Sequence, residues 1–263
     1  MLKICIFLLL ILFNAIFLQQ IVKNNKIVKN ANYLFSLVFI IISLPLWKFN
    51  NHWLIFILTF LLMLYYREIT LLNNMNNKKQ RVLNTGLLIG LMMVVDHGLV
   101  VFYPISLFAI LYYKEFNWKH AIIQFIGLLI PFSIYYILLV LKLEPSNFMY
   151  TSQPNFSELH ILFTEYPIHL SILSIISLIS GYELFNKYYK KTEHAKKGFI
   201  MLISITILIV FQIILSNSFK WVYLLCVPLT IIISNYLMYV NRVYFPTFLL
   251  GLWYISFLFE FFL

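Results

Sequence analysis

Two adjacent ionisable side chains interrupt a long apolar stretch near the middle of the chain. Residues 82–113 are mostly apolar, and Asp96 and His97, followed by Gly98, are the acid and the histidine within them. A carboxylate and an imidazole are groups that general acid–base chemistry and divalent-metal binding both use. Ionisable groups within a membrane are costly and are therefore functional candidates. We take Asp96 and His97 as candidate catalytic residues that line a cavity, with a solvated turn as the alternative.

Further acids and histidines fall in segments that we place on the same side of a membrane as Asp96. Glu165 precedes His169 by four residues, the spacing of one helix face, but Pro167 between them weakens that relation. No spacing in this set is diagnostic of a site, and solvated or paired helix ends are the simpler interpretation. The set comprises His52, Glu144, Glu158, His160, Glu165 and His169.

The familiar catalytic and nucleotide-binding motifs are absent from the sequence. It contains no Walker loop, GxGxxG, HExxH, GxSxG or paired CxxC. Nucleotide-driven and classical hydrolase chemistry are therefore unsupported, and we expect no cofactor and no metal site. Cys5 and Cys226 lie in different apolar segments, which favours buried, inert thiols over a disulfide.

The composition indicates a protein whose solvent is largely lipid. Of the 263 residues, 62% are hydrophobic and 11% are charged, whereas soluble domains average about 25% charged residues. We therefore predict an all-α, polytopic integral membrane protein with a single transmembrane domain and membrane lipids around it. The net charge of +10 is better explained by basic loops on one membrane side than by a nucleic-acid partner, and we expect none.

A spanning helix needs about 20 apolar residues, and about ten segments approach that length. The first is interpreted as a retained helix rather than a cleaved signal peptide, because no small-residue cleavage site follows it. The fourth and fifth form a short hairpin at 83–113. The segments are 4–22, 33–47, 53–66, 83–95, 99–113, 121–141, 168–185, 199–215, 221–239 and 245–262.

The distribution of lysine and arginine predicts the topology. With ten passes, the odd-numbered loops hold 15 basic residues and the even-numbered loops hold 3. Basic loops are cytoplasmic, so we place both termini in the periplasm. A single pass over 82–113 would reverse every later loop, including the lysine-rich run KYYKKTEHAKK. Asp96, His97 and Gly98 are therefore predicted to form a tight outward turn, with Gly98 suited to positive φ.

Small and polar residues within the apolar segments predict helix–helix contacts. Gly86 and Gly90 form a GxxxG pattern, for which close helix packing is the preferred interpretation. Amide side chains inside spans are expected to form hydrogen bonds between helices. These amides belong to Asn14, Gln124, Gln212 and Asn235.

Four runs follow one another along the chain, namely TGLLIGLMMVV, FYPISLFAILYY, FNWKHAIIQFIGLLIPF and VYLLCVPLTIIISNYL. Their order resembles that in a family of uncharacterised multi-pass inner-membrane proteins of Bacteroidota. Some family members carry a doubtful label as a beta-carotene monooxygenase, and the family is a domain of unknown function with no established activity. Its members usually have one more N-terminal helix, so we expect a short or truncated start here. The resemblance implies architecture and an inner-membrane location, not a mechanism.

Three classes of function remain open. The first is a non-catalytic component or assembly factor of a bacterial envelope system, with envelope proteins as partners. The second is an enzyme on a lipid-linked substrate, resembling a C-type glycosyltransferase with an outward-facing site. The third is a small-molecule or lipid transporter, which usually carries ionisable groups at mid-membrane and internal repeats.

Overall fold

The computed structural model describes residues 2–25, 33–45, 52–72, 77–113, 118–141, 164–216, 219–240 and 244–262. Within these ranges the regular structure is entirely helical, as predicted. The helices are α1 (Leu2–Asn24), α2 (Leu34–Ser43), α3 (His52–Leu71), α4 (Lys78–Val95), α5 (Phe102–Tyr112), α6 (Trp118–Val140), α8 (Pro167–Asn186), α9 (Glu193–Ser216), α10 (Phe219–Met238) and α11 (Tyr244–Phe262). Two 3₁₀ turns, His97–Val101 and Tyr188–Lys190, precede α5 and α9.

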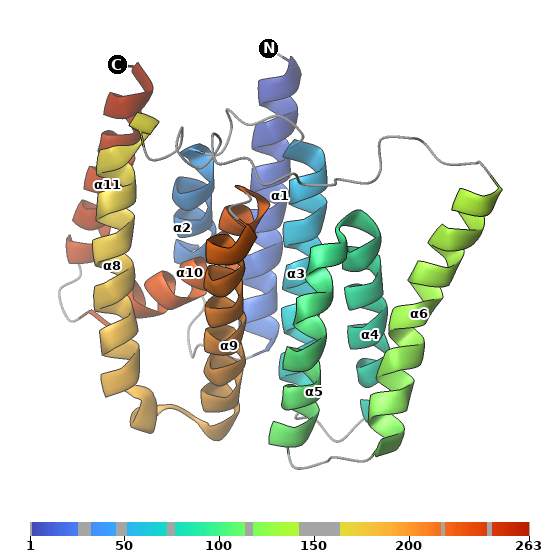
Figure 1. Ribbon diagram of the computed structural model, residues 1–263. Helices are drawn as coiled ribbons and strands as arrows, with labels where there is room; N and C mark the ends of the chain where they lie inside the picture. Colours follow the sequence, from blue (N-terminus) through green and yellow to red (C-terminus); the bar gives the residue numbers. More distant parts are fainter. Residues whose placement is uncertain are drawn as a thin grey trace.

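The helices stand side by side in one bundle, with both chain ends at the same end of it (Figure 1). Asn14 of α1 contacts Thr59 of α3, and Asn25, just after α1, contacts Thr70 of α3, so these two helices run parallel. At the opposite end from the termini, α1 and α3 finish and α4 and α9 begin. We call this the basic end, because most of the described lysines lie there, and the other the terminal end.

Each of the ten predicted segments coincides with one of the ten described α-helices. Among the described residues, six helices are long and apolar enough to cross a membrane, namely α1, α3, α6, α8, α9 and α10. The apolar helices α2, α5 and α11 are shorter. Of the ten predicted membrane passes, six thus correspond to helices that are long and apolar enough to cross a membrane. The other four correspond to helices that do not meet this description.

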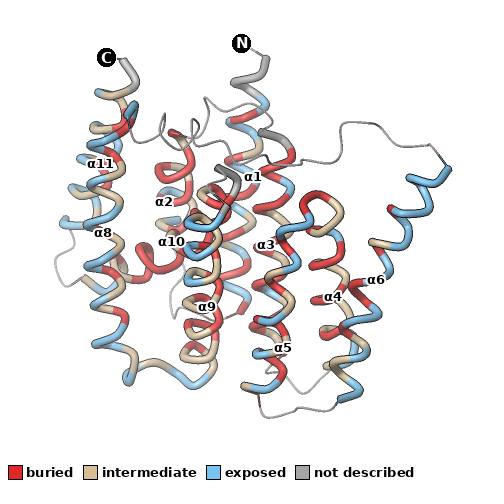
Figure 2. Tube along the Cα trace, in the orientation of Figure 1, coloured by how far each residue is buried: buried red, intermediate tan, exposed pale blue. Residues whose placement is uncertain are grey.

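Helices α10 and α3 form the centre of the bundle, and α8 and α6 lie at its edges (Figure 2). Within the candidate spans, 72% of the α10 residues and 61% of the α3 residues are buried, against 22% in α8. Large side chains such as Trp221, Tyr65 and Phe102 are fully buried in the core. Exposed apolar side chains on α6 and α8, including Leu178 and Ile134, form the surface that lipid would cover.

The closest backbone contact in the bundle joins α4 and α6. A Cβ at Gly86 would overlap the Gln124 carbonyl oxygen, and one at Gly127 would lie 2.6 Å from the Leu83 carbonyl oxygen. A Cβ at Gly90 would lie 2.5 Å from the Leu128 carbonyl oxygen. The predicted close packing at the GxxxG pattern is confirmed, and Gly127 supplies the matching gap on α6.

The hairpin turn between α4 and α5 differs in detail from the prediction. The predicted turn forms, but Gly98 does not have positive φ, so the tolerance of positive φ that suited it to a turn is not used here. The chain instead forms a 3₁₀ turn over His97–Val101, which keeps ordinary right-handed dihedral angles. Gly98 lies close to other side chains, since a Cβ there would be 3.2 Å from Asp96 Oδ1 and 3.6 Å from the Trp221 ring. Position 98 therefore favours a small residue because neighbouring atoms leave little room for a side chain, and not because its φ angle requires glycine.

Candidate functional site

Asp96 serves as the cap of the turn between α4 and α5. It has extended dihedral angles, φ −153° and ψ 115°, and its side chain is buried, with 6% exposed. The Gly98 N–H donates to Asp96 Oδ1 at 2.9 Å. A short polar side chain at such a position satisfies backbone donors that the helical turn leaves open. The contact gives Asp96 a definite structural role at the terminal end.

His97 lies on the surface beside α6. Its side chain is exposed, and its ring meets Phe132 edge-on, with centroids 6.5 Å apart. The structure gives no hydrogen bond between the Asp96 and His97 side chains, both of which it describes. The two candidates are thus adjacent in sequence but have different surroundings, one buried and capping, the other open.

A second cluster at the terminal end joins α8 to α11. The His169 ring lies against Trp253, with centroids 5.4 Å apart, and meets the Phe257 ring edge-on at 5.8 Å. The Glu260 carboxylate accepts hydrogen bonds from the N–H groups of Ile168 and His169, the latter at 3.1 Å. These are open donors in the first turn of α8, after Pro167 at its start. Glu260 therefore caps α8 from another helix.

The imidazole of His169 is enclosed by this cluster, with 1% of the residue exposed. Neither of its ring nitrogens has a hydrogen-bond partner among the described residues, and the same holds for Trp253 Nε1. A buried polar group without a partner costs about 1–3 kcal/mol. His169 is the most unusual polar side chain at the terminal end, although its neighbours are aromatic rings rather than groups that exchange protons.

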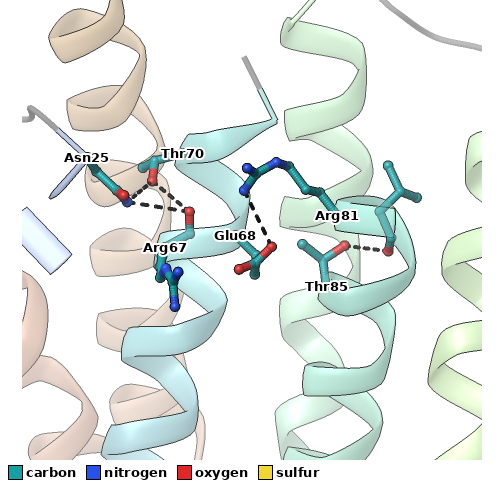
Figure 3. Close-up of polar contacts among 7 residues, drawn as sticks. Asn25, Arg67, Glu68, Thr70, Arg81 and Thr85 are labelled. Atoms are coloured by element: carbon teal, nitrogen blue, oxygen red, sulfur yellow. Dashed lines mark hydrogen bonds and ion pairs between the residues drawn. The ribbon is translucent and has the colours of Figure 1, made fainter. Parts of the chain in front are cut away.

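At the basic end, a hydrogen-bond network joins the end of α1 to α3 (Figure 3) and, through His194, to α9. Asn25, with 2% of its surface exposed, donates to Thr70 Oγ1 at 2.6 Å and to the Arg67 carbonyl oxygen at 3.4 Å. His194 Nε2 lies 2.8 Å from the Asn25 carbonyl oxygen, so Nε2 carries the proton. One helix C-terminus is thereby tied to two other helices through an asparagine.

The same end holds an ion pair between α3 and α4. The Arg81 guanidinium lies 3.7 Å from the Glu68 carboxylate, and the two side chains are 24% and 13% exposed. Figure 3 shows the arginine reaching across from the first turns of α4 toward α3. The pair neutralises a half-buried carboxylate beside the network around Asn25, which is a structural use of both charges.

Polar side chains inside the bundle also connect helices. Asn14 donates to Thr59 Oγ1 at 3.1 Å, Gln124 donates to Ser106, and Asn235 accepts from Lys191 at 2.8 Å. The predicted hydrogen bonds between helices are confirmed for Asn14 and Gln124, whereas Asn235 of α10 bonds a lysine in the connection between α8 and α9. Gln212 also has a partner in the structure.

The remaining acids and histidines of the sequence-derived set are only partly described. His169 is brought into the cluster with Glu260, which the sequence did not suggest because the two lie on the first turn of α8 and the last turns of α11.

Glu165 is exposed. The side chain of His52, and Glu144, Glu158 and His160, lie outside the described residues. Among the described residues, no group of three or more His, Cys, Asp or Glu side chains is placed to hold a metal ion.

Comparison with protein-family models, with curated proteins and with solved structures gave no match to this chain.

Proposed function

We propose that the protein is a non-catalytic component or assembly factor of an envelope system in a bacterial cytoplasmic membrane. In this proposal the basic end faces the cytoplasm and both termini face the periplasm, as the loop charges favour. The resemblance to the Bacteroidota family belongs to the same proposal and supports the inner-membrane location.

One observation carries the proposal: three acidic side chains of the bundle hold structural elements in place. Asp96 caps the turn before α5, and Glu260 on α11 caps α8. Glu68 on α3 pairs with Arg81 on α4. Groups that hold helix ends in place are poorly available for proton transfer, whereas a rigid scaffold requires them.

Co-purification is the direct test of a component or assembly factor. The full chain, tagged and extracted in a mild detergent, is expected to bring down the same partner in a fixed ratio from its native membrane. The matched control is Gly86→Leu, which should separate α4 from α6 and release the partner. A monodisperse protein without any bound protein would contradict the proposal.

An enzyme acting on a lipid-linked substrate is the alternative, and the exposed position of His97 beside α6 favours it. The two functions differ in what the Asp96→Asn and His97→Ala variants do to complementation of an envelope phenotype. A component should tolerate both, because asparagine still accepts the Gly98 hydrogen bond. Loss of complementation by variants that accumulate normally would support the enzyme.

Orientation can be tested by labelling single cysteines in intact cells. Thr192 lies at the basic end and is exposed, and Leu141 lies at the far end of α6 and is exposed. In a Cys5→Ser background, Leu141→Cys should react with an impermeant maleimide from outside and Thr192→Cys should not. Cys226 is buried and should not react with the maleimide. Labelling of Thr192→Cys from outside would reverse the orientation.

A further inference from the structure

A half-buried lysine lies on a platform of aromatic rings at the basic end. Lys191, between the two helices α8 and α9, donates to Asn235 Oδ1 at 2.8 Å. Its ammonium lies 4.4 Å from the centroid of Phe199 and 5.1 Å from that of Tyr239. Ring faces attract a cation and hold it in position. The ammonium is therefore fixed by neutral groups.

The same arrangement recurs on the neighbouring residues of α9. The Lys196 ammonium lies 5.9 Å from the Tyr188 ring centroid, and that of Lys197 lies 5.4 Å from Tyr113. These rings come from the 3₁₀ turn before α9 and from the end of α5. We call the lysines and rings together the lysine–tyrosine cluster; its members are Lys187, Lys190, Lys191, Lys196, Lys197, Tyr113, Tyr188, Phe199 and Tyr239.

Positive charge in this cluster exceeds the nearby negative charge. Between Glu183 and Lys197 the chain has five lysines and two acids. Glu183 pairs with Lys187, and no described carboxylate lies within ion-pair distance of Lys191 or Lys196. Partial burial, and then the charge of Lys187, lower the pKa of Lys191 to about 8. An anion beside Lys191 would stabilise its charged ammonium and so oppose both causes of the lowered pKa.

Apolar surface continues from the cluster along α8. Leu178, Tyr182 and Phe185 are each at least 68% exposed on the half of α8 that leads to Lys187. Tyrosines mark the membrane interface, so the lysines lie at headgroup depth and the exposed face of α8 at acyl-chain depth. A ligand with an anionic headgroup and apolar chains would contact both the lysines and the apolar face of α8. A soluble anion would contact the lysines alone.

We propose that the lysine–tyrosine cluster binds the phosphate headgroup of an anionic phospholipid, with its acyl chains along α8. The proposal rests on the membrane embedding but not on the non-catalytic role. Basic pockets between helices at a membrane surface recognise anionic headgroups in this way. Asn235 and the rings of Phe199 and Tyr239 orient one ammonium, and Lys196 and Lys197 supply the others.

The test is a titration of the purified full-length protein in detergent with short-chain phosphatidylglycerol, followed by thermal unfolding. Phosphatidylcholine and inorganic phosphate are the parallel probes. Phosphatidylglycerol should stabilise the wild-type protein, and each of Lys191→Gln and Lys196→Gln should weaken its apparent affinity about fivefold. Lys191→Arg keeps the charge and should retain most of the binding.

Lys79→Gln is the matched control, because Lys79 is an exposed lysine at the same end, on α4. It should leave the affinity unchanged. Equal stabilisation by phosphatidylcholine, or an equal loss in Lys79→Gln, would reduce the effect to general charge attraction and overturn the site. Stabilisation by inorganic phosphate as strong as that by phosphatidylglycerol would overturn the lipid assignment. Lys196→Gln decides the question if Lys191→Gln does not accumulate, because Lys196 makes no contact with Asn235.

Discussion

The Glu260 carboxylate on α11 accepts a hydrogen bond at 3.1 Å from the N–H of His169, 91 residues earlier in the chain. With the bond from Ile168, it satisfies two of the open donors of α8 and places a negative charge at the positive end of that helix. A helix cap is usually a local residue, and here it fixes one helix to another.

We therefore expect Glu260→Ala to lower the free energy of unfolding by about 1–2 kcal/mol, through loss of the cap and its charge. Thermal unfolding in detergent measures this change. Glu183→Ala, on the capped helix α8, is the control, because its pair with Lys187 is solvent-exposed and should contribute at most about 0.5 kcal/mol. Equal losses in the two variants would show that the α8–α11 contact adds nothing.

The glycine contact between α4 and α6 gives a second prediction. Gly86→Ala and Gly127→Ala should each destabilise the protein by about 1–3 kcal/mol or more, because the new methyl group meets backbone atoms that have no room to move. Accumulation in the membrane and thermal unfolding are the measurements.

Gly181 and Gly251 provide the control for that pair. Each is inside a helix, and a Cβ there would meet nothing within 4 Å. Alanine at either position should be neutral or stabilising by up to about 1 kcal/mol, because alanine is the better helix former. A loss at Gly181 comparable to that at Gly86 would mean that the whole bundle, and not this contact, is sensitive to added methyl groups.

Asp96 should respond to the loss of its acceptor atom rather than of its charge. Asp96→Ala removes the acceptor for the Gly98 N–H and should cost about 1 kcal/mol, while Asp96→Asn should cost little. Thermal unfolding of the two variants separates these effects. A stable Asp96→Asn protein that fails to complement would point back to chemistry at this residue.

His169 should be replaceable by an apolar ring. Because its nitrogens make no well-formed hydrogen bond and have only the Trp253 backbone nearby, His169→Phe should leave stability unchanged or raise it by about 1 kcal/mol. His169→Asn keeps a polar group in the same place and should destabilise by comparison. If His169→Phe is stable but inactive in complementation, the imidazole has a function beyond packing.

Lys191 should make stability depend on pH in the alkaline range. Its pKa is about 8 in the folded protein against 10.5 for an ordinary lysine, so between these pH values the unfolded state binds more protons. The free energy of unfolding contributed by this residue therefore rises with pH across that window. The unfolding temperature of the wild type should therefore rise relative to that of Lys191→Met as the pH increases across the window.

Lys187 and Tyr239, which lie near Lys191, are present in both proteins, so the comparison isolates the effect of Lys191. Bound phosphatidylglycerol should flatten the pH dependence, because an adjacent anion favours the charged ammonium. A difference that is constant over the window would show that Lys191 titrates as a solvated lysine.

The sequence predicted the helices well, because apolar segment length and loop charge depend on local composition. It underestimated the length of two helices at the basic end. Helix α4 begins at Lys78 and α9 at Glu193, each several residues before its predicted start, because charged residues extend the helix beyond its apolar part. Gly98 was considered suited to positive φ, but the close Asp96 Oδ1, 3.2 Å from where a Cβ would lie, explains the small residue better.

The polar contacts could not be derived in the same way. Asp96 was recognisable as unusual, but its role depends on the dihedral angles of the turn. Glu260, Asn25 and Arg81 were recognisable only as residues near segment ends, since their partners come from other helices and sequence spacing carries no information about them. Where a polar group serves a contact between distant segments, only the fold identifies its partner.

The α4–α6 contact has a consequence for how the chain is made. These helices run parallel with α5 between them in sequence, and Gly90 lies against Leu128 and Pro131. Their contact can therefore form only after Pro131 has been synthesised. Until then α4, with Lys78, Lys79 and Arg81 in its first turn, lacks the neighbour that covers its glycine face. The hairpin of α4 and α5 therefore precedes the partner that covers its glycine face, and α6 completes that contact once it has followed them out.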